Sequence, residues 1–483
     1  MIMKKTLYVL ALVALLIGTL SACDEQGLDL NGGNSEKSEH QALFETIKDH
    51  LQNSHYSEPD EEALYQGAID GMIESLEDPF SQYFSQEEYE QYHDSFGESF
   101  VGIGVTVENV DNNVVVRKVW EDSPANRAGM QPGDVITHID GEDYRDRSYI
   151  ETVANVRGEE GSTIRITVDR PGVKDPITLE MVREEIENPT IEYERVTHEG
   201  ETLGYISINT FGSETVNRFK DALTTLENEE GGIDGLLIDL RNNGGGYLTT
   251  VNELLDIFIT EGDRPMFTIE QLQGGEWVSV DYEASGSEAK PYDILTIVNG
   301  YSASASEVFA AGMKEKGGYD VLGMPTYGKG TMQSAISLEP HNQDELHLSL
   351  GRWLTPNGNW VDRIDGDMEH VTPTIEVEQN PYFTGYNVLV GDEPLVYDTV
   401  ADQNENAQRI LNLMGYDVRE DGYFDEATRD AVEALQQEHG LDVTGEIDES
   451  TGAVLSEYLF DYRTDKLNDH QYQSALDYFT NHD

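Results

Sequence analysis

Patterns typical of strands alternate with patterns typical of helices between residues 190 and 381, and no other feature constrains the fold of this chain as much. Apolar runs at 203–208, 236–240 and 294–298 have the length of buried strands, and apolar residues over 219–226 recur at helical spacing. The second and third runs each end in a glycine-containing loop that leads into a helical pattern. Because sites form at such strand ends, this segment is predicted to be an α/β core that carries the chemistry.

The length and the charge of the chain limit the number of domains and the classes of partner that it can have. A chain of 483 residues is too long for one ordinary core, and it predicts two to four domains. Its formal net charge of −64 repels a polyanionic backbone, which excludes nucleic acid as a partner. A hydrophobic share of 38% suffices for buried cores. With one cysteine and no H-E-x-x-H motif, we predict neither a disulfide, nor a metal site, nor a cofactor.

The lone cysteine follows an apolar run near the N-terminus. Two lysines precede residues 7–20, which are too few to span a bilayer as a helix and predict a signal-peptide core. The run ends in Leu-Ser-Ala-Cys, which resembles the lipobox of bacterial lipoproteins. The resemblance implies a signal peptide over 1–23, a lipid anchor on Cys23 and a mature protein outside the cytoplasmic membrane. The alternatives are a signal sequence that stays uncleaved as an anchor, or cleavage after Ala22 without lipid. Residues 24–40 are predicted to be a flexible tether.

Two amphipathic helices are predicted within residues 41–96. Phe44, Ile47 and Leu51 lie on one helical stripe, and a second stripe at four-residue spacing follows Pro59. A pair of helices buries little surface by itself. We therefore expect a partner surface such as a second protomer, which would make these helices a homodimer contact, with plain bundle packing as the alternative.

A β-rich module is predicted at 97–183, where short strand patterns are separated by Pro-Gly and Asp-Gly turns. The sequences Val-Gly-Ile-Gly-Val at 101–105 and Ser-Pro-Ala-Asn-Arg-Ala-Gly at 123–129 resemble a PDZ domain, with a generic hairpin module as the alternative. The resemblance implies capture of a protein C-terminus by backbone N–H groups and a strand edge. The implied peptide-binding residues are Gly102, Ile103, Gly104 and Val105. Arg157 is a candidate sensor of bound peptide, or else an ordinary surface cation.

A helical unit is predicted at 399–460, followed by a tail at 461–483. Its stretches Leu-Asn-Leu-Met-Gly-Tyr at 411–416, Asp-Gly-Tyr-Phe at 421–424 and His-Gly-Leu-Asp-Val-Thr-Gly at 439–445 resemble a three-helix peptidoglycan-binding domain. The resemblance implies cell-wall peptidoglycan as a partner. A helical cap without a ligand is the alternative.

Three serines crowd the turn after the strand pattern at 294–298, where residues 302–307 read Ser-Ala-Ser-Ala-Ser-Glu. Ser304 with Glu307 three residues later would form a capping box, which is the structural alternative. Capping needs one serine, however, and the small alanines allow a substrate backbone to approach the helix N-terminus closely. Because that N-terminus offers N–H groups to an oxyanion, we predict a nucleophilic serine in this turn.

A serine nucleophile needs a base, and two arrangements compete. Gly-Tyr-Ser-Ala-Ser comes near a G-x-S-x-G elbow, which would make Ser302 the nucleophile of a hydrolase with Asp344 and His347. The alternative base is Lys329, whose flanking glycines permit the burial that lowers a lysine pKa from about 10.4. The surrounding sequence does not have the spacing of a phosphate-binding loop.

The Ser-Ala-Ser-Ala-Ser-Glu segment, together with Tyr-Gly-Lys-Gly at 327–330, resembles the carboxy-terminal processing protease family of serine peptidases with a Ser–Lys dyad. The resemblance implies that Ser304 is the nucleophile, that Lys329 is the general base and that Gln333 orients this lysine. It also implies that the backbone N–H groups of Ala305 and Gly245 form the oxyanion hole. The sequence Glu-Asp-Pro-Phe-Ser-Gln-Tyr-Phe at 77–84 resembles the family's stretch before the PDZ domain, and its part at 78–81 is here called the lead-in segment. A peptidase core is thus predicted at 184–385.

These observations predict a multidomain α and β chain. Its parts are N-terminal helices, a PDZ module inserted into an α/β serine peptidase core and a small C-terminal three-helix domain. The predicted activity is that of an extracytoplasmic endopeptidase, anchored to the bacterial cell membrane and facing the cell wall, which recognises free protein C-termini. A non-catalytic PDZ scaffold on the cell wall and a cell-wall amidase are the rivals; the amidase lacks a catalyst of its own.

Overall fold

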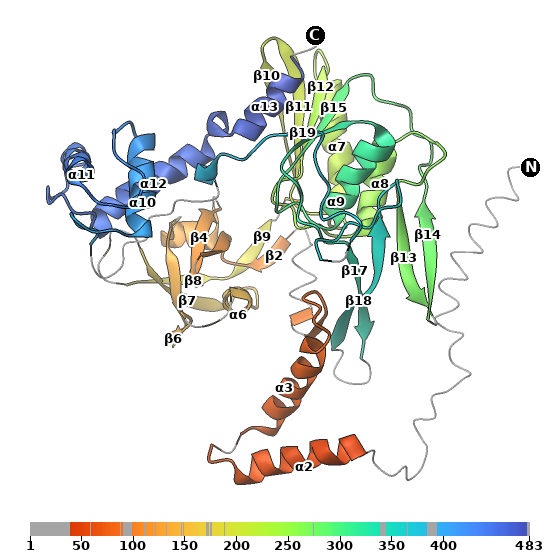
Figure 1. Ribbon diagram of the computed structural model, residues 1–483, viewed down its shortest axis with the longest axis horizontal. Coiled ribbons are helices and arrows are strands. Elements are labelled where there is room, and N and C mark those ends of the chain that lie inside the picture. The colour runs from red at the N-terminus through yellow and green to blue at the C-terminus, as the bar shows by residue number, and fades with distance from the viewer. Residues whose placement is uncertain are drawn as a thin grey trace, which may run out of the picture. The chain divides into compact units, whose positions relative to one another are not determined.

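The computed structural model describes residues 39–480 apart from 58, 87, 90–98, 111–112, 121, 132, 146, 148, 171–172, 174–175, 188, 274, 339–343, 365 and 384–393 (Figure 1). The chain separates into two compact units, Met1–Glu77 and Asp78–Asp483. Cys23, the predicted signal peptide and nearly all of the predicted tether lie outside the described residues. Among the described helices, none combines the length and the apolar composition needed to cross a membrane.

The N-terminal unit contains the two predicted helices, α2 (Glu39–Ser54) and α3 (Glu61–Glu74). The carboxylate of Asp60 caps α3 by accepting hydrogen bonds from the N–H groups of its first turn, at 3.0 and 3.3 Å. Lys48 of α2 forms an ion pair of 2.9 Å with Glu61 of α3. Neither helix has a buried residue. The exposed apolar side chains of this unit include Leu43, Phe44, Ile47, Leu51, Met72 and Leu76.

The module predicted to resemble a PDZ domain is an antiparallel sheet with two short helices. Its elements are β2 (Ser99–Gly102), β3 (Val105–Val110), β4 (Asn113–Val119), α5 (Pro124–Ala128), β5 (Val135–Ile139), β6 (Glu142–Asp143), α6 (Tyr149–Val156), β7 (Thr163–Asp169), β8 (Ile177–Val182) and β9 (Glu184–Glu187). The main sheet has the order β3-β4-β5-β7-β8, with β6 on β5, while β2 pairs with β9. The module has a hydrophobic core of its own, so it packs as a separate domain.

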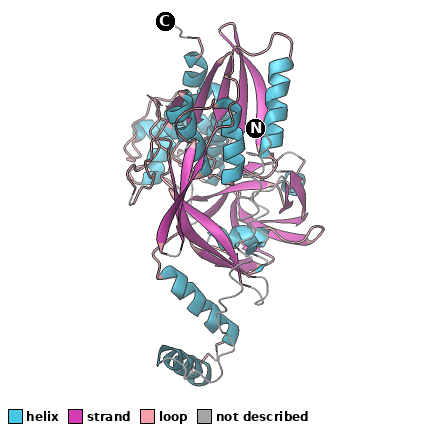
Figure 2. Cartoon of the chain, turned by 90° about the vertical axis from the view of Figure 1, so that its right-hand side faces the viewer, coloured by secondary structure: helices cyan, strands magenta, loops and turns pink. Residues whose placement is uncertain are grey.

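The α/β core is built on a six-stranded sheet of order β10-β11-β12-β15-β16-β19. The strands of the chain are drawn in magenta in Figure 2. The elements of the α/β core are β10 (Ile191–His198), β11 (Glu201–Ile208), α7 (Thr215–Asn228), β12 (Gly235–Asp239), α8 (Leu248–Phe258), β15 (Asp293–Val298), α9 (Ala305–Ala311), the π-helix η2 (Gly312–Gly317), β16 (Asp320–Gly323) and β19 (Ile375–Glu376). All neighbouring pairs are parallel except β10 with β11. The strand and helix pattern predicted from the sequence is therefore confirmed. Helices α7, α8 and α9 pack on one face, where the largest hydrophobic cluster lies.

A second sheet brings segments from distant parts of the chain together. Its strands are β1 (Gln82–Phe84), β13 (Phe267–Gln273), β14 (Glu276–Tyr282), β17 (Thr331–Ser337) and β18 (Glu345–Leu354). Strand β18 pairs with β1, β13 and β17. Because β1 follows the lead-in segment and β17 follows Lys329, this sheet holds the two segments close to each other.

The C-terminal part forms the predicted three-helix domain and then returns to the α/β core. Its elements are η3 (Pro381–Phe383), α10 (Asp402–Leu413), α11 (Glu426–Glu438), α12 (Glu449–Thr464), η4 (Lys466–Asn468) and α13 (His470–Tyr478). Helices α10 to α12 enclose their own core. Leu476 and Phe479, in and next to α13, pack with Leu237, Leu295 and Ile297 on the second face of the sheet. The stretch predicted as a tail therefore completes the packing of the core.

Candidate active site

Ser304 occupies a strained position at the start of α9. Its backbone has φ 54° and ψ −112°. A positive φ is unfavourable for a residue that carries a Cβ atom. Such strain costs about 1–3 kcal/mol and persists where the surrounding structure imposes it, as at the sharp strand-to-helix turns that present nucleophiles. The side chain is only half-buried. Ser304 is therefore presented in the manner of a nucleophile.

The two neighbouring serines have structural roles. Ser302 is fully buried; its hydroxyl donates to the carbonyl oxygen of Leu240 at 2.8 Å and accepts the N–H of Asn299 at 3.0 Å. Ser306 is also fully buried, and its hydroxyl donates to the carbonyl oxygen of Asn243 at 2.9 Å. Both serines hold the turn against the loop that follows β12. Ser302 and Ser306 are therefore buried and hydrogen-bonded to the backbone, whereas Ser304 is partly exposed.

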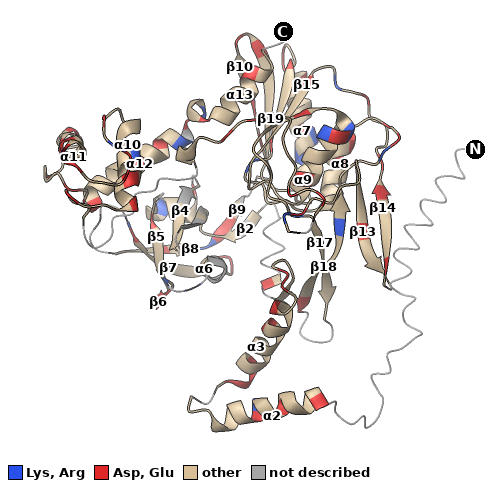
Figure 3. Ribbon diagram, viewed as in Figure 1, with Lys and Arg blue, Asp and Glu red and all other residues tan. Residues whose placement is uncertain are grey.

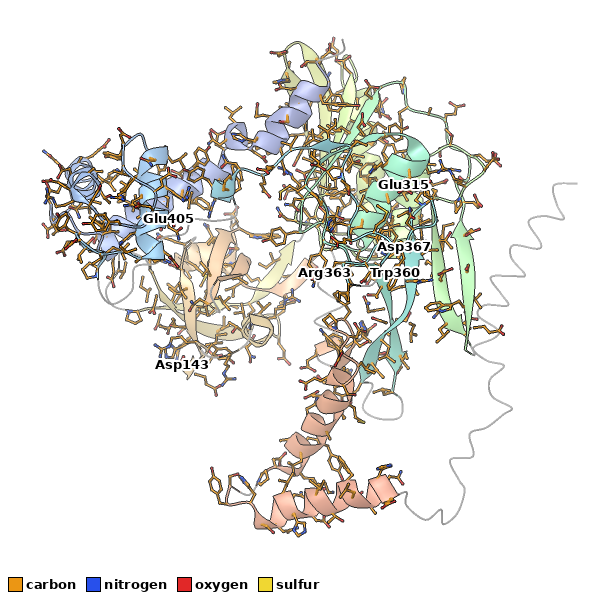
Figure 4. The ribbon with its side chains drawn as sticks, in the orientation of Figure 1. Asp143, Glu315, Trp360, Arg363, Asp367 and Glu405 are labelled. Carbon is orange, nitrogen blue, oxygen red and sulfur yellow. The ribbon has the colours of Figure 1, made fainter. Side chains whose placement is uncertain are left out.

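Lys329 lies in a tightly packed loop between β16 and β17. A Cβ atom at Gly330 would lie 1.8 Å from a backbone carbonyl oxygen, and one at Gly328 would lie 2.2 Å from another. The indole of Trp353 donates to the carbonyl oxygen of Lys329 at 2.9 Å. The indole of Trp360, which is labelled in Figure 4, donates to the carbonyl oxygen of Gly330 at 3.1 Å. The flanking glycines thus allow the close approach of backbone that the sequence predicts.

The surroundings of the lysine amine pull its pKa in two directions. Burial lowers the pKa of Lys329, while the negative charges of Asp78 and Glu307 raise it, and burial has the larger effect. The Nζ atom lies 4.4 Å from the centroid of the Phe80 ring. Burial therefore shifts Lys329 toward the neutral amine that a general base requires, whereas the ring face attracts the ammonium form.

Glu307 joins the nucleophile turn to the lysine loop. Its buried carboxylate accepts the backbone N–H of Ser304 at 2.7 Å, of Lys329 at 2.9 Å and of Gly328 at 2.7 Å, as well as the hydroxyl of Thr326 at 2.6 Å. Burial raises the pKa of Glu307, and the four hydrogen bonds oppose this effect. The contact predicted as a capping box is thus present on the glutamate side, and it also holds the lysine loop.

The candidate oxyanion donors lie beside the nucleophile. Ala305 is the first residue of α9, so helix geometry leaves its N–H without an intrahelical partner. Gly245 has φ +115°, and a Cβ atom there would lie 3.0 Å from the Cβ of Ser304 and 3.1 Å from the nitrogen of Ala305. The N–H of Gly245 donates to Oδ1 of Asn243 at 2.8 Å. Gly245 can therefore serve an oxyanion only once this hydrogen bond opens.

Gln333, the predicted orienting residue, lies on β17. Its Nε2 atom donates to the hydroxyls of Thr331 at 3.0 Å and of Ser349 at 2.9 Å. These bonds fix the amide next to the lysine loop. Its action on Lys329 stays a prediction.

Asp344 and His347, the partners considered for Ser302, contact a different part of the chain. Asp344 accepts the hydroxyl of Tyr83 at 2.5 Å, and the ring of His347 packs edge-on against Phe84 with centroids 5.0 Å apart. Ser302 is buried against the loop after β12 instead. The described contacts give no support to this alternative triad.

The predicted peptide-binding residues line one apolar pocket of about 70 Å³ in the PDZ-like module. The residues around it are Gly102, Ile103, Gly104, Val105, Val107, Val114, Ile136, Val153, Val156 and Arg157. Gly104 has φ +75°, and a Cβ atom there would lie 2.3 Å from the side chain of Ser123. The pocket thus joins the glycine loop to α6, whose valines belong to no sequence motif and carried no signal.

No sequence pattern indicated the buried contact of Asn243 or the contact of Phe80 with Lys329. Asn243 is fully buried, and its Nδ2 donates to the carbonyl oxygen of Ile208 at 2.7 Å. The Asp-Pro-Phe-Ser motif marked Phe80 but gave no contact for it. Within the described residues, no group of three or more His, Cys, Asp and Glu side chains could hold a metal ion.

Four segments of the chain match known protein families. Residues 202–377 match peptidase family S41, residues 101–181 a PDZ domain, residues 401–455 a putative peptidoglycan binding domain and residues 18–88 the activating protease CtpB N-terminal domain.

Two curated relatives and one solved structure show the extent of the likeness. The carboxy-terminal processing protease CtpB of Bacillus subtilis is 36% identical over 444 residues, which cover 92% of this chain and 90% of that protein. A probable CtpA-like serine protease of Staphylococcus aureus is 31% identical over 445 residues, covering 91% and 85%. The photosystem II D1 C-terminal processing protease is 25% identical with a TM-score of 0.47, over 70% of this chain and 87% of that one. The chain therefore belongs to the carboxy-terminal processing proteases, which are serine peptidases of family S41 with a PDZ domain.

Proposed function

We propose that this chain is an extracytoplasmic endopeptidase that captures protein C-termini with its PDZ domain and cleaves with a dyad of Ser304 and Lys329. The observation that carries the proposal is the link through Glu307. One buried carboxylate binds the backbone of both residues, and of the three serines in the turn only Ser304 is strained and partly exposed.

The chemistry follows from these positions. The Ser304 hydroxyl attacks the scissile carbonyl while the neutral amine of Lys329 takes its proton, so a serine acyl-enzyme forms and the ammonium returns the proton to the leaving amine. The N–H of Ala305 and a glycine N–H after β12 stabilise the oxyanion. Water then attacks the ester, with Lys329 acting as base again. Gln333 keeps the lysine oriented through both steps.

The PDZ pocket selects the substrate. It is lined by valine and isoleucine side chains beside the glycine loop, so it favours an apolar last residue whose carboxylate meets backbone N–H groups. Arg157 at its edge pairs with a carboxylate or carbonyl of the bound peptide and reports its presence. The substrates are secreted or membrane proteins with free C-termini.

Features of the flanking regions support a position of the enzyme in the cell envelope. The match to a peptidoglycan binding domain and the homology to CtpB support a position outside the cytoplasmic membrane, against the cell wall. Lipidation of Cys23 provides the anchor, because the Leu-Ser-Ala-Cys sequence follows a signal-peptide core. The exposed apolar stripes of α2 and α3 provide the surface for a homodimer.

Replacing each serine of the turn tests the proposal. Ser304→Ala abolishes peptide hydrolysis, whereas Ser302→Ala and Ser306→Ala lower stability by about 1–3 kcal/mol each and retain cleavage. Steady-state hydrolysis of one peptide and urea unfolding of all three variants provide the comparison. An active Ser304→Ala, or a folded but inactive Ser302→Ala, refutes the dyad.

A further inference from the structure

Phe80 covers the amine of the proposed general base. The two residues are far apart in the chain, yet Nζ of Lys329 lies 4.4 Å from the centroid of the Phe80 ring. A cation within about 6 Å of a ring face is attracted by the ring quadrupole. Phe80 is half-buried, so its ring also keeps part of the solvent away from the amine.

A chain of hydrogen bonds holds the lead-in segment in this position. The carboxylate of Asp78 accepts the N–H of Phe80 at 3.0 Å and the hydroxyl of Ser81 at 2.5 Å. The buried hydroxyl of Ser81 in turn accepts the N–H of Ser349 at 3.2 Å. The Ser349 hydroxyl accepts Nε2 of Gln333 at 2.9 Å. The segment that carries Phe80 is thus connected to the residue proposed to orient Lys329.

We propose that Phe80 is a positioning residue of the dyad, which holds the Lys329 amine against its ring and is itself anchored by Asp78 and Ser81. The inference rests on the proposed role of Lys329 as general base. It gives the lead-in segment a direct effect on the catalytic step. The N-terminal unit ends at the residue before Asp78, so this segment is also where that unit joins the rest of the chain.

The charged groups around Lys329 determine whether the loss of the Phe80 ring raises or lowers the pKa of the lysine amine. Asp78 of the lead-in segment and Glu307 of α9 both favour the ammonium form. Arg352 on β18 is paired with Glu270 at 2.7 Å, and the guanidinium of Arg363 stacks on the ring of Tyr327 at 4.3 Å. The ring of Phe80 adds a further attraction for the ammonium, so its removal lowers the pH at which the neutral amine appears.

The pH dependence of kcat/KM on a small peptide tests the inference. Phe80→Leu retains an apolar cover but loses the quadrupole, so the midpoint of the acidic limb falls by about one pH unit. The plateau kcat falls about tenfold or more because the amine loses the surface that positions it. Phe80→Tyr retains the ring and the wild-type midpoint. Phe84→Leu is the matched control, because Phe84 packs on His347, and it moves neither quantity.

A second measurement does not depend on activity. In Ser304→Ala protein, the rate at which Lys329 is acetylated by acetic anhydride at different pH, mapped by mass spectrometry, reports the pKa of the amine directly. Adding Phe80→Leu lowers this pKa. An unchanged midpoint and an unchanged labelling profile in the Phe80→Leu proteins overturn the role of Phe80 alone. An active Lys329→Ala enzyme, in contrast, overturns the dyad itself.

Discussion

The Oε2 atom of Glu307 accepts the backbone N–H of Lys329 at 2.9 Å, and the same atom accepts the N–H of Ser304 at 2.7 Å. One buried atom therefore fixes the loop of the proposed base relative to the turn of the proposed nucleophile. The contact needs a full carboxylate, since Oε1 is occupied by Gly328 and Thr326 as well. The spacing of the proposed dyad thus depends on a residue to which the proposal assigns no proton transfer.

Glu307→Gln is predicted to lower kcat at least tenfold while changing KM little. The amide directs an NH₂ group at backbone N–H donors, so at least one of them loses its partner, at a cost of about 1–3 kcal/mol. Peptide hydrolysis and urea unfolding measure the two effects. Glu253→Gln, at an exposed position on the neighbouring α8, serves as the control. Wild-type kcat in Glu307→Gln would show that the bridge does not hold the dyad.

Local sequence patterns predicted the strands and helices of this site well, but they could not predict contacts between segments that are distant in the chain. The apolar runs before 299 and 240 specified β15 and β12, because a buried parallel strand needs continuous apolar residues. The roles of the serines within the turn depend on what each hydroxyl meets after folding. Ser302 is buried against Leu240, a contact that no local pattern encodes.

The same limit applies to larger elements. The sequence predicted a tail at 461–483, whereas His470–Tyr478 forms a helix on the second face of the core sheet. A short amphipathic pattern does not reveal which surface it covers. Likewise, the lead-in motif marked Phe80, and only the pairing of β1 with β18 brings it to the lysine loop.

Truncation after residue 464 is predicted to destabilise the peptidase. It removes Tyr472, Leu476 and Phe479 from the sheet, and each buried side chain of this kind contributes about 1.5–3 kcal/mol. It also breaks the 2.6 Å ion pair of Asp469 with Arg241, which lies in the loop after β12. An internal deletion of the three-helix domain that retains α13 through a short linker is the matched control. It keeps the wild-type melting temperature and small-peptide cleavage but loses binding to insoluble cell wall. Equal melting temperatures for both deletions would contradict the structural role of α13.

Recognition of the free C-terminus is predicted to depend on the PDZ pocket. A peptide with an apolar last residue and a free carboxylate is cleaved faster than its amidated counterpart, because the Gly102–Val105 loop offers N–H groups to an anion. The ratio of kcat/KM for the two peptides is the measurement. Arg157→Ala reduces this ratio without affecting Ser304. Equal kcat/KM values for the two peptides in the wild-type enzyme would contradict recognition of the free C-terminus.

Stability is predicted to rise with salt. Acidic side chains occur throughout the described domains (Figure 3), and the formal net charge is −64. Self-repulsion weakens as the Debye length falls from about 30 Å at 0.01 M to about 10 Å at 0.1 M salt. Thermal melting in a series of sodium chloride concentrations tests this expectation. A melting temperature that is flat or falls up to molar salt is the contrary result.

The site of the acyl-enzyme tests the central claim most directly. The enzyme is incubated with an activated ester substrate, quenched in acid and digested, and the modified peptide is sequenced by mass spectrometry. The account predicts an acyl group on Ser304 in the wild-type enzyme and none at neutral pH in Lys329→Ala, whose serine lacks its base. An acyl group on Ser302, or acylation of Ser304 at the wild-type rate in Lys329→Ala, would contradict the Ser304–Lys329 dyad.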